Sequence, residues 1–216
     1  MNSSGAQPRA ILYALADSRL PIGGHVHSGG VEEAVTSGLV RDLTSVEAYL
    51  RRRVATSGLV AASLAAAVCA GELTLGRADA EADARTLAPA ARAASRAQGR
   101  GLLRLAKQVW PQAQWRSLPS KPHLSTAFGA VGLACGAAPA EIAGVVVYST
   151  LTGAATAAQR LLALDPADIA ACTVRLAPVC DRTAAAAVTG LAALSDPLQD
   201  VLAERHPRRD MPLFAS

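Results

Sequence analysis

The chain has 216 residues, of which 51% are hydrophobic, 3% aromatic and 18% charged. This length suits one domain with a sizeable core, and the high apolar content excludes a mainly disordered chain. Alanine fills 49 positions. Because alanine is the strongest helix former and covers a sheet poorly, the composition favours helices packed on small side chains. Four scattered cysteines without a C-x-x-C pair argue against a disulfide scaffold.

The formal net charge is +4, and 19 arginines but only two lysines carry the positive side. The planar guanidinium fork suits partners rich in carboxylate or phosphate groups. The charge is therefore compatible with acidic partners, and on its own it indicates nothing more specific.

The first seven residues are polar and lack the apolar stretch of a signal peptide. Between residues 124 and 159 the only charged side chain is Glu141. This stretch is rich in Ala, Gly, Ser and Thr rather than in the larger apolar residues of a membrane span. We therefore expect two buried helices there, no membrane contact and a cytoplasmic protein.

Helix signals follow one another along the whole chain. Thr44 and Glu47 form the T-x-x-E pattern of a capping box, and Pro89 and Pro166 stand where a first-turn proline opens a helix. No strand-like alternation, solenoid repeat or long polar linker is present. We expect one all-α domain over residues 1–216, a compact bundle of roughly eight to ten helices, with residues 206–216 as a tail. The expected helices cover residues 11–17, 30–37, 44–57, 59–70, 77–85, 89–110, 123–136, 139–164, 166–176, 183–194 and 197–205.

His25 and His27 are the weak candidates for metal binding. Two imidazoles separated by one residue can meet one ion, but a protein site usually needs three or four ligands. His27 bound to the backbone of a tight loop is the favoured alternative. The chain also lacks the E-x-x-H pairs of di-metal bundles and the H-E-x-x-H pattern of zinc proteases.

Catalytic patterns are equally weak. Ser28 lies in H-S-G-G, without the G-x-S-x-G pattern of a nucleophile elbow, so a helix cap is its favoured role. The glycines around it precede a helix N-terminus, but no G-x-x-x-x-G-K-[ST] is present, and nucleotide hydrolysis is not expected. The sequence therefore predicts a protein that is not an enzyme.

Four arginines recur at every fourth position of the helix expected over residues 89–110: Arg92, Arg96, Arg100 and Arg104. This spacing places them on one stripe, where like charges repel one another. A solvated face, acidic groups of the same fold, or an acidic partner would each account for the stripe. Nucleic acid is not expected, because no helix-turn-helix signature or interleaved aromatic residues accompany it.

The segment from Leu15 to Val35, with the run D-S-R-L-P-I-G-G-H-V-H-S-G-G-V-E-E, is very similar to the N-terminal signature of the UreF urease accessory proteins. Residues 98–105 resemble the G-R-x-L-L-R region of that family. Residues 123–164 resemble its central H-x-x-x-F-G and A-A-x-R-L segment, and residues 195–216 its final segment, which ends in L-F-x-S. The similarity follows the family order along nearly the whole chain.

The resemblance implies an all-α fold that forms a homodimer and acts as a non-catalytic scaffold. It implies binding to UreD (also called UreH) and to the GTPase UreG, which together deliver nickel into apo-urease. The chain itself would bind no cofactor: the complex would handle nickel, and UreG would hold GTP. The alternative is a nickel carrier that binds the metal directly through His25 and His27.

The family motifs also suggest partner-binding positions. His25 replaces the usual aromatic residue of the signature, and prolines interrupt the expected approach to the terminal Leu-Phe. We expect the tail to become ordered on partner binding. The predicted partner-binding residues are Pro21, Gly23, Gly24, His27, Ser28, Gly29, Arg100, Arg104, Gln159, Arg160, Asp200, His206, Leu213, Phe214 and Ser216.

Overall fold

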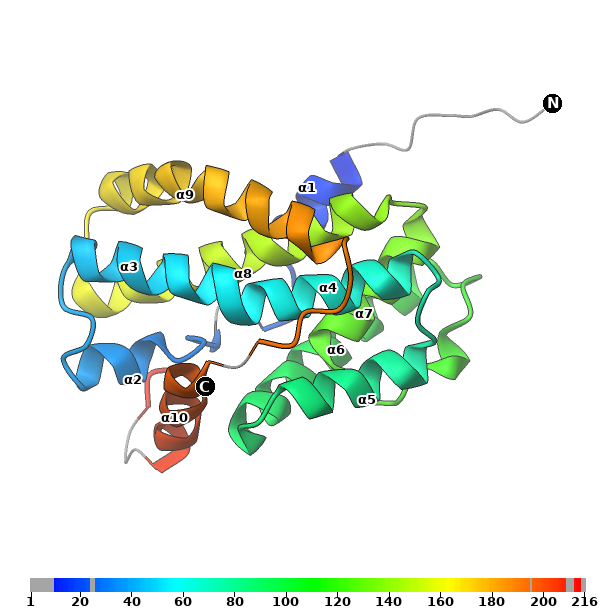
Figure 1. The fold of residues 1–216 in the computed structure, drawn as a ribbon, viewed down its shortest axis with the longest axis horizontal. Coiled ribbons are helices and arrows are strands. Elements are labelled where there is room, and N and C mark those ends of the chain that lie inside the picture. Colours follow the sequence, from blue (N-terminus) through cyan, green and yellow to red (C-terminus); the bar gives the residue numbers. More distant parts are fainter. Residues whose placement is uncertain (1–9, 24–25, 195, 209–211, 215–216) are drawn as a thin grey trace.

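The computed structural model describes residues 10–23, 26–194, 196–208 and 212–214, and every regular element in these ranges is helical. The predicted all-α class is therefore confirmed (Figure 1). The α-helices are α1 (Ala10–Ala16), α2 (Val31–Thr36), α3 (Leu43–Arg53), α4 (Leu59–Cys69), α5 (Leu75–Arg85), α6 (Pro89–Val109), α7 (Leu124–Cys135), α8 (Pro139–Leu162), α9 (Pro166–Ala187) and α10 (Pro197–Arg205). Short 3₁₀ turns cover Trp115–Ser117 and His206–Arg208.

The predicted helix break at Gly58 is wrong. A π-helical turn, Val54–Gly58, joins α3 to α4 without interruption, and Gly58 has a helical φ of −63°. A Cβ at this glycine would lie 3.3 Å from the Arg53 carbonyl oxygen and 3.5 Å from Cγ2 of Thr150 in α8, so the residue is packed inside the helix and against α8. Gly58 therefore does not end a helix.

The N-terminal cap of α3 is Asp42. The Ser45 N–H donates to Asp42 Oδ1 at 2.8 Å, and the Asp42 N–H donates to Ser45 Oγ at 3.0 Å. The predicted box of Thr44 and Glu47 is therefore wrong, because a reciprocal cap stands two residues earlier. Glu47 instead accepts hydrogen bonds from Arg175 of α9.

The two helices predicted over residues 166–176 and 183–194 are a single helix, α9, which ends at Ala187 and continues through Pro178. Proline in a helix interior removes one backbone hydrogen bond and crowds the preceding turn. Leu176 and Val179 on either side of it are buried. Their burial offsets part of that cost, and local propensity does not decide the helix end here.

The centre of the bundle consists of α4, α7 and α8, and small side chains allow these helices to approach closely. Eight consecutive residues of α4, from Ala62 to Cys69, are buried. A Cβ added to Gly129 of α7 would lie only 2.5 Å from Cβ of Val68. The interior is therefore packed on Ala, Gly and Ser, as the alanine-rich composition predicts.

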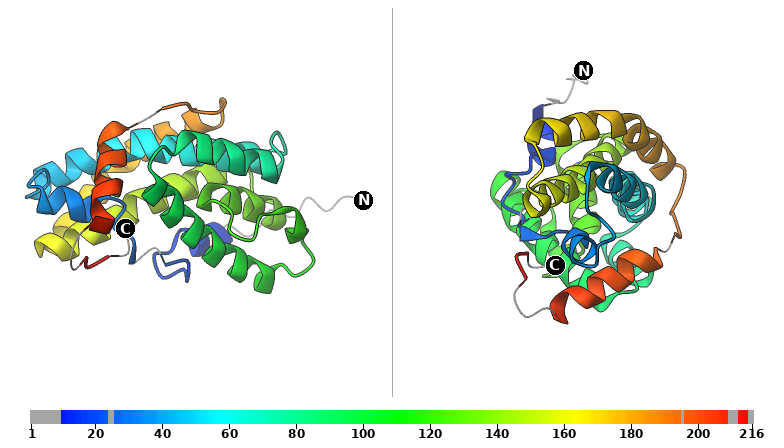
Figure 2. Two further views of the ribbon diagram at one scale, coloured as in Figure 1. Left: turned by 90° about the horizontal axis from the view of Figure 1, so that it is seen from below. Right: turned by 90° about the vertical axis from the view of Figure 1, so that its left-hand side faces the viewer.

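Figure 2 shows how the remaining helices surround this centre. α9 packs on α8 and α4, α5 and α6 pack on α7, and α10 lies against α2 and α6. The described part of the C-terminal tail lies beside the first turn of α2, 181 residues away in sequence.

One helical stretch of the described residues, Leu43–Cys69, is long and apolar enough to cross a membrane by length and composition, with a mean hydropathy of 1.2. Of this window, 61% is buried inside the fold, as in the core helix of a globular domain. Residues 124–159, the stretch with a single charged side chain, form α7 and most of α8. Among the described residues, neither of these helices is both long and apolar enough to cross a membrane. All four cysteines are free and buried, and burial raises the pKa of the Cys69 and Cys180 thiols to about 11.

Candidate functional site

The loop of residues 21–30, here termed the signature loop, is fixed to α3 through its last two glycines. The Gly29 carbonyl accepts from Arg53 Nη1 at 2.7 Å and lies 3.1 Å from the Tyr49 hydroxyl. The Gln199 side chain of α10 lies against the same two groups: its Oε1 accepts from Arg53 at 2.9 Å. Gly30 has a φ of +87°, and a Cβ there would lie 2.9 Å from the Tyr49 hydroxyl. A side chain at Gly30 would therefore meet both backbone strain and a steric clash.

Ser28 joins the signature loop to α2. Its buried Oγ accepts the N–H of Glu32 at 3.3 Å, so it makes the kind of hydrogen bond expected of a capping serine. The helix itself begins at Val31, and Gly30 holds the formal N-cap position. The predicted cap position of Ser28 is therefore wrong by two residues, although its hydroxyl still accepts an N–H of the first turn of α2.

Glu32 links the start of α2 to the C-terminal tail. One carboxylate oxygen accepts the Leu213 N–H at 2.7 Å, and the other accepts the Phe214 N–H at 3.1 Å. His206 Nε2 lies 2.7 Å from the second oxygen and donates to it, since an ionised carboxylate only accepts. Burial alone raises the pKa of Glu32, but these three hydrogen bonds outweigh it and hold the pKa below its usual range. We call Glu32, His206, Leu213 and Phe214 the tail cluster.

Arg160, near the end of α8, packs against Phe214 of the tail cluster. Its guanidinium carbon lies 5.1 Å from the centre of the Phe214 ring, which is a cation–π distance. The Phe214 side chain is buried, whereas Leu213 is 77% exposed. The two adjacent tail residues therefore face opposite ways, one into the fold and one to the surface.

Two carboxylates of α10 satisfy the N-terminus of α6. Asp200 accepts the N–H of Ala88 at 3.2 Å, and Glu204 accepts the N–H of Ala90 at 2.8 Å. The first N–H groups of a helix have no intrahelical partner, and negative charge is favoured near them. Asp200 thus has an internal role, and its predicted part in partner binding remains a prediction.

The arginine stripe of α6 divides into two halves. Arg96 donates to Asp79 at 2.9 Å and to Asp83 at 2.6 Å, both on α5, and Arg92 donates to two backbone carbonyls. Arg100 and Arg104 are exposed, and neither has an ion pair within the described part of the chain. Acidic groups of the same fold therefore neutralise the first half, and the second half faces solvent.

Close packing places the exposed half of the stripe beside the signature loop. A Cβ at Gly101 would lie 3.0 Å from the Cα of Ile22, so the backbones of α6 and the loop are in direct contact. Leu102 and Leu103 of the same turn are buried. The G-R-x-L-L-R pattern thus combines two contacts with the interior and two outward-facing arginines.

Behind the stripe, His123 connects α5, α6 and α7. Its Nε2 lies 2.8 Å from Asp83 Oδ1, and its Nδ1 lies 3.0 Å from Ser95 Oγ. Hydrogen bonds from His123 and Arg96 hold the pKa of Asp83 below its usual range. Serine hydrolases use the same three residue types, but here Ser95 Oγ also accepts the N–H of Leu124 and so caps α7. The arrangement therefore fixes three helices to one another.

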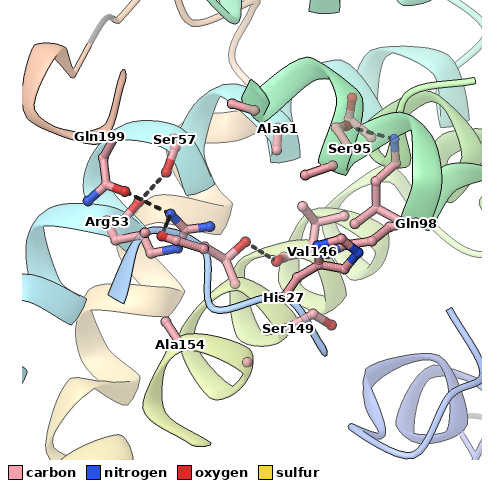
Figure 3. Close-up of a pocket in the computed structure, with 18 of the residues that line it drawn as sticks. His27, Arg53, Ser57, Ala61, Ser95, Gln98, Val146, Ser149, Ala154 and Gln199 are labelled. Atoms are coloured by element: carbon pink, nitrogen blue, oxygen red, sulfur yellow. Dashed lines mark hydrogen bonds between the residues drawn. The ribbon is translucent and has the colours of Figure 1, made fainter. Parts of the chain in front are cut away.

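A cavity of about 610 Å³ lies between the signature loop, α4, α6, α8 and α10 (Figure 3). Arg53, Ser57 and Gln199 lie at one end of it, and His27, Ser95 and Gln98 lie at the other. Apolar side chains form much of the wall between these ends. A volume of this size is within the range of small-molecule sites.

The predicted pair of metal ligands can be followed only in part, because His25 and Gly24 lie outside the described residues. His27 is half-buried at the wall of the cavity. Within the described ranges, no three His, Cys, Asp or Glu side chains come together as a metal site. Direct nickel binding by His25 and His27 therefore stays a hypothesis.

The structure brings most of the motif residues together around the signature loop. Ser28, Gly29, His206 and Phe214 are in this network, and Gln159 is half-buried next to Arg160. Pro21 is exposed, and Gly23 has a φ of +79°. Ser216 lies outside the described residues. The partner-binding role of all these residues stays a prediction.

Sequence reasoning missed the residues that hold the loop and the tail: Glu32, Tyr49, Arg53 and Gln199. Glu32 falls at the end of the signature, which is a signal that could have identified it. Arg53 is the last of three consecutive arginines, and the sequence gives no sign that this one, rather than Arg51 or Arg52, meets the loop.

Comparison with known proteins agrees with these motifs. The UreF family model matches residues 40–177. The urease accessory protein UreF of Mycobacterium sp. (strain JLS) is 68% identical over 95% of this chain and 97% of its own length. The UreF proteins of Mycolicibacterium vanbaalenii and Mycobacterium marinum are 65% and 60% identical, each over 96% of this chain and 98% of their own length. The resemblance inferred from the signature loop, the G-R-x-L-L-R turn and the tail is therefore confirmed, and the chain belongs to the UreF family of urease accessory proteins.

Proposed function

We propose that this chain is a non-enzymatic scaffold of urease maturation, which bridges UreD/UreH and the GTPase UreG and so delivers nickel into apo-urease. The observation that carries the proposal is the convergence of four separate motif segments on one region. The signature loop, the Arg100–Arg104 turn, the end of α8 and the tail cluster are linked by direct contacts.

The exposed residues of this region are suited to protein contacts. Arg100 and Arg104 present two guanidinium groups without an acidic partner in the described part of the fold. Leu213 of the tail cluster presents an exposed apolar side chain. An acidic surface of UreD or UreG would match the arginines, which form strong paired hydrogen bonds with carboxylates. The hydrogen bond from the Leu213 N–H to Glu32 fixes the backbone from which the leucine side chain extends.

Cofactor handling follows from the scaffold role. We expect no cofactor bound by this chain itself: nickel is the cargo of the complex, and UreG holds GTP. We also expect a homodimer that works in the cytoplasm, without nucleic acid or membrane partners. The family motifs support this proposal, and the absence of a nucleotide-binding motif in the sequence agrees with it.

The test is activation of purified apo-urease by UreD, UreG, GTP, bicarbonate and nickel, with and without this chain. The proposal predicts activation that depends on the chain, and no GTP hydrolysis by the chain in the absence of UreG. Equal urease activity with and without the chain, or GTPase activity in a preparation free of UreG, would overturn it.

The alternative is a nickel carrier that binds the metal through His25 and His27. It predicts tight binding of nickel to the isolated protein, lost in a His25→Ala/His27→Ala double variant. Calorimetry distinguishes the two hypotheses. The nickel-carrier hypothesis is excluded if nickel gives no more heat than weak surface binding and if this heat is unchanged in the double variant.

A further inference from the structure

Among the residues that the structure describes, Arg53 differs from the two arginines before it in having no acidic partner. Arg51 pairs with Glu47, and Arg52 pairs with Asp196 at 2.7 Å. Within the described residues, Arg53 forms no ion pair and donates instead to two neutral oxygens, of Gly29 and Gln199. A guanidinium that contacts only neutral acceptors retains its attraction for an anion. Arg53 also lies at the wall of the 610 Å³ cavity.

Two donor atoms at this position are buried without a hydrogen-bond partner in the described part of the structure. They are Nε of the Arg53 guanidinium and Nε2 of the neighbouring Gln199 amide. The orientation of the Gln199 amide is fixed, because Arg53 Nη1 donates to its Oε1 at 2.9 Å. Buried donors are rarely left unpaired in folded proteins, and each one is costly. Both groups belong to side chains that line the same end of the cavity.

The other charged groups around the cavity are already engaged. Arg85 is paired with Glu81, Asp17 with Arg19, and Asp196 with Arg52. Asp200 accepts the N–H of Ala88. Arg53 is therefore the lining cation that is left for a ligand, within the residues described.

The rest of the wall suits hydrocarbon. Val60, Ala61, Leu64, Phe128, Val146 and Ala154 all line the cavity. A ligand that fits this cavity has an apolar body that contacts the hydrocarbon wall. At the end formed by Arg53 and Gln199 it carries an oxyanion, which accepts hydrogen bonds from the guanidinium and the amide.

We propose that this cavity binds a small monocarboxylate, with its carboxylate on Arg53 and Gln199 and its hydrocarbon part against the apolar wall. Arg53 also donates to the Gly29 carbonyl of the signature loop. A ligand bound to Arg53 would therefore help to hold the loop in position. The proposal does not depend on the scaffold role, and either can fail without the other.

Calorimetry on the full-length protein tests the site with matched probes at pH 7. Hexanoate has the required charge and an apolar chain, hexylammonium has the same chain with the opposite charge, and acetate lacks most of the chain. We expect one hexanoate per chain, no binding of hexylammonium, and affinity for acetate that is lower by about tenfold or more, since each buried methylene contributes to binding.

Variants locate the binding. Arg53→Gln is expected to weaken hexanoate binding by about tenfold or more, as the loss of a charged hydrogen bond implies. Arg51→Gln, on the exposed side of the same helix, is the control and should bind like the wild type. If Arg53→Gln does not fold, Ala61→Phe provides the second test, because it fills the cavity without touching the donors. No heat from hexanoate, equal binding of hexylammonium, or binding that survives Ala61→Phe would overturn the proposal.

Discussion

The Glu32 carboxylate and the His206 imidazole meet at 2.7 Å across 174 residues of sequence, and both side chains are about 2% exposed. Together with the N–H groups of Leu213 and Phe214, this pair attaches the C-terminal tail to the first turn of α2. The contact places the two ends of the family motif set, the signature loop and the tail, in one structural unit.

The Glu32–His206 contact makes stability depend on pH. The folded-state pKa of Glu32 lies below its ordinary value of 4.5, so its ionised form stabilises the fold above that pH, and this contribution is lost as the pH falls through the lowered pKa. Glu32→Gln should therefore lower the free energy of unfolding by about 1–3 kcal/mol at pH 7. The difference from wild type should shrink below pH 4.5.

Urea unfolding at several pH values measures this effect. The control is Glu72→Gln, because Glu72 is exposed and has no ion pair within the described residues. A Glu32→Gln variant with the same stability and the same pH profile as the control would show that the tail cluster does not stabilise the fold.

Gly38 provides a matched control for substitution of Gly30 in the signature loop. Both have a positive φ, but a Cβ at Gly30 would lie 2.9 Å from the Tyr49 hydroxyl, whereas a Cβ at Gly38 would meet nothing within 4 Å. Gly38→Ala should cost about 1 kcal/mol, the usual penalty for this backbone conformation. Gly30→Ala should cost about 1–3 kcal/mol more, because the contacts of Tyr49 must shift.

Chemical unfolding of both glycine variants provides the comparison, and binding of UreD and UreG provides a second readout. We expect Gly30→Ala to lose complex formation and Gly38→Ala to keep it. Equal effects of the two substitutions would mean that the packing of the loop on α3 does not control partner binding.

The contact of α10 with α6 predicts a stability effect for the motif residue Asp200. Replacing Asp200 and Glu204 together by alanine removes both acceptors from the N-terminus of α6 and should cost about 1–2 kcal/mol. Asp181→Ala, on the exposed surface of α9, is the control. Thermal unfolding that gives the double variant the same Tm as this control would contradict the capping role.

The two halves of the arginine stripe should respond differently to charge reversal. Arg100→Glu/Arg104→Glu should leave the circular dichroism spectrum unchanged and weaken partner binding by about tenfold or more, since charge-assisted contacts are lost and like charges are introduced. Arg96→Glu should instead destabilise the fold, because Asp79 and Asp83 lose their partner.

The control for charge reversal is Arg182→Glu, an exposed arginine on α9 without an ion pair in the described part of the chain. Binding can be followed by calorimetry or surface plasmon resonance at two salt concentrations. If the control weakens binding as much as the Arg100/Arg104 variant, the effect reflects net charge rather than this turn of α6.

The helical class and most helix positions could be predicted from the sequence, because alanine content, first-turn prolines and the absence of strand-like alternation all agree. The errors occur where tertiary packing outweighs local signals. Gly58 and Pro178 both suggest helix ends, yet the helices continue through them because neighbouring residues pack in the core. The cap at Asp42 was missed because two capping patterns overlap within six residues.

The motif positions could be identified from the sequence, but their division into buried and exposed residues could not. Sequence spacing places Arg96 and Arg100 on the same stripe, and only the position of α5 decides that one is paired and the other is exposed. Likewise, nothing in the chain order indicates that Glu32 accepts hydrogen bonds from residues more than 170 positions away. Such contacts depend on how the helices are arranged in three dimensions.

The most direct test of the scaffold role is light scattering behind size exclusion, on this protein alone and mixed with UreD and UreG from the same organism. The account predicts a stable co-eluting complex that contains all three proteins, with a mass above that of any pair. Elution of this protein unchanged beside both partners would contradict the scaffold role, and the nickel-carrier test with His25 and His27 would then take precedence.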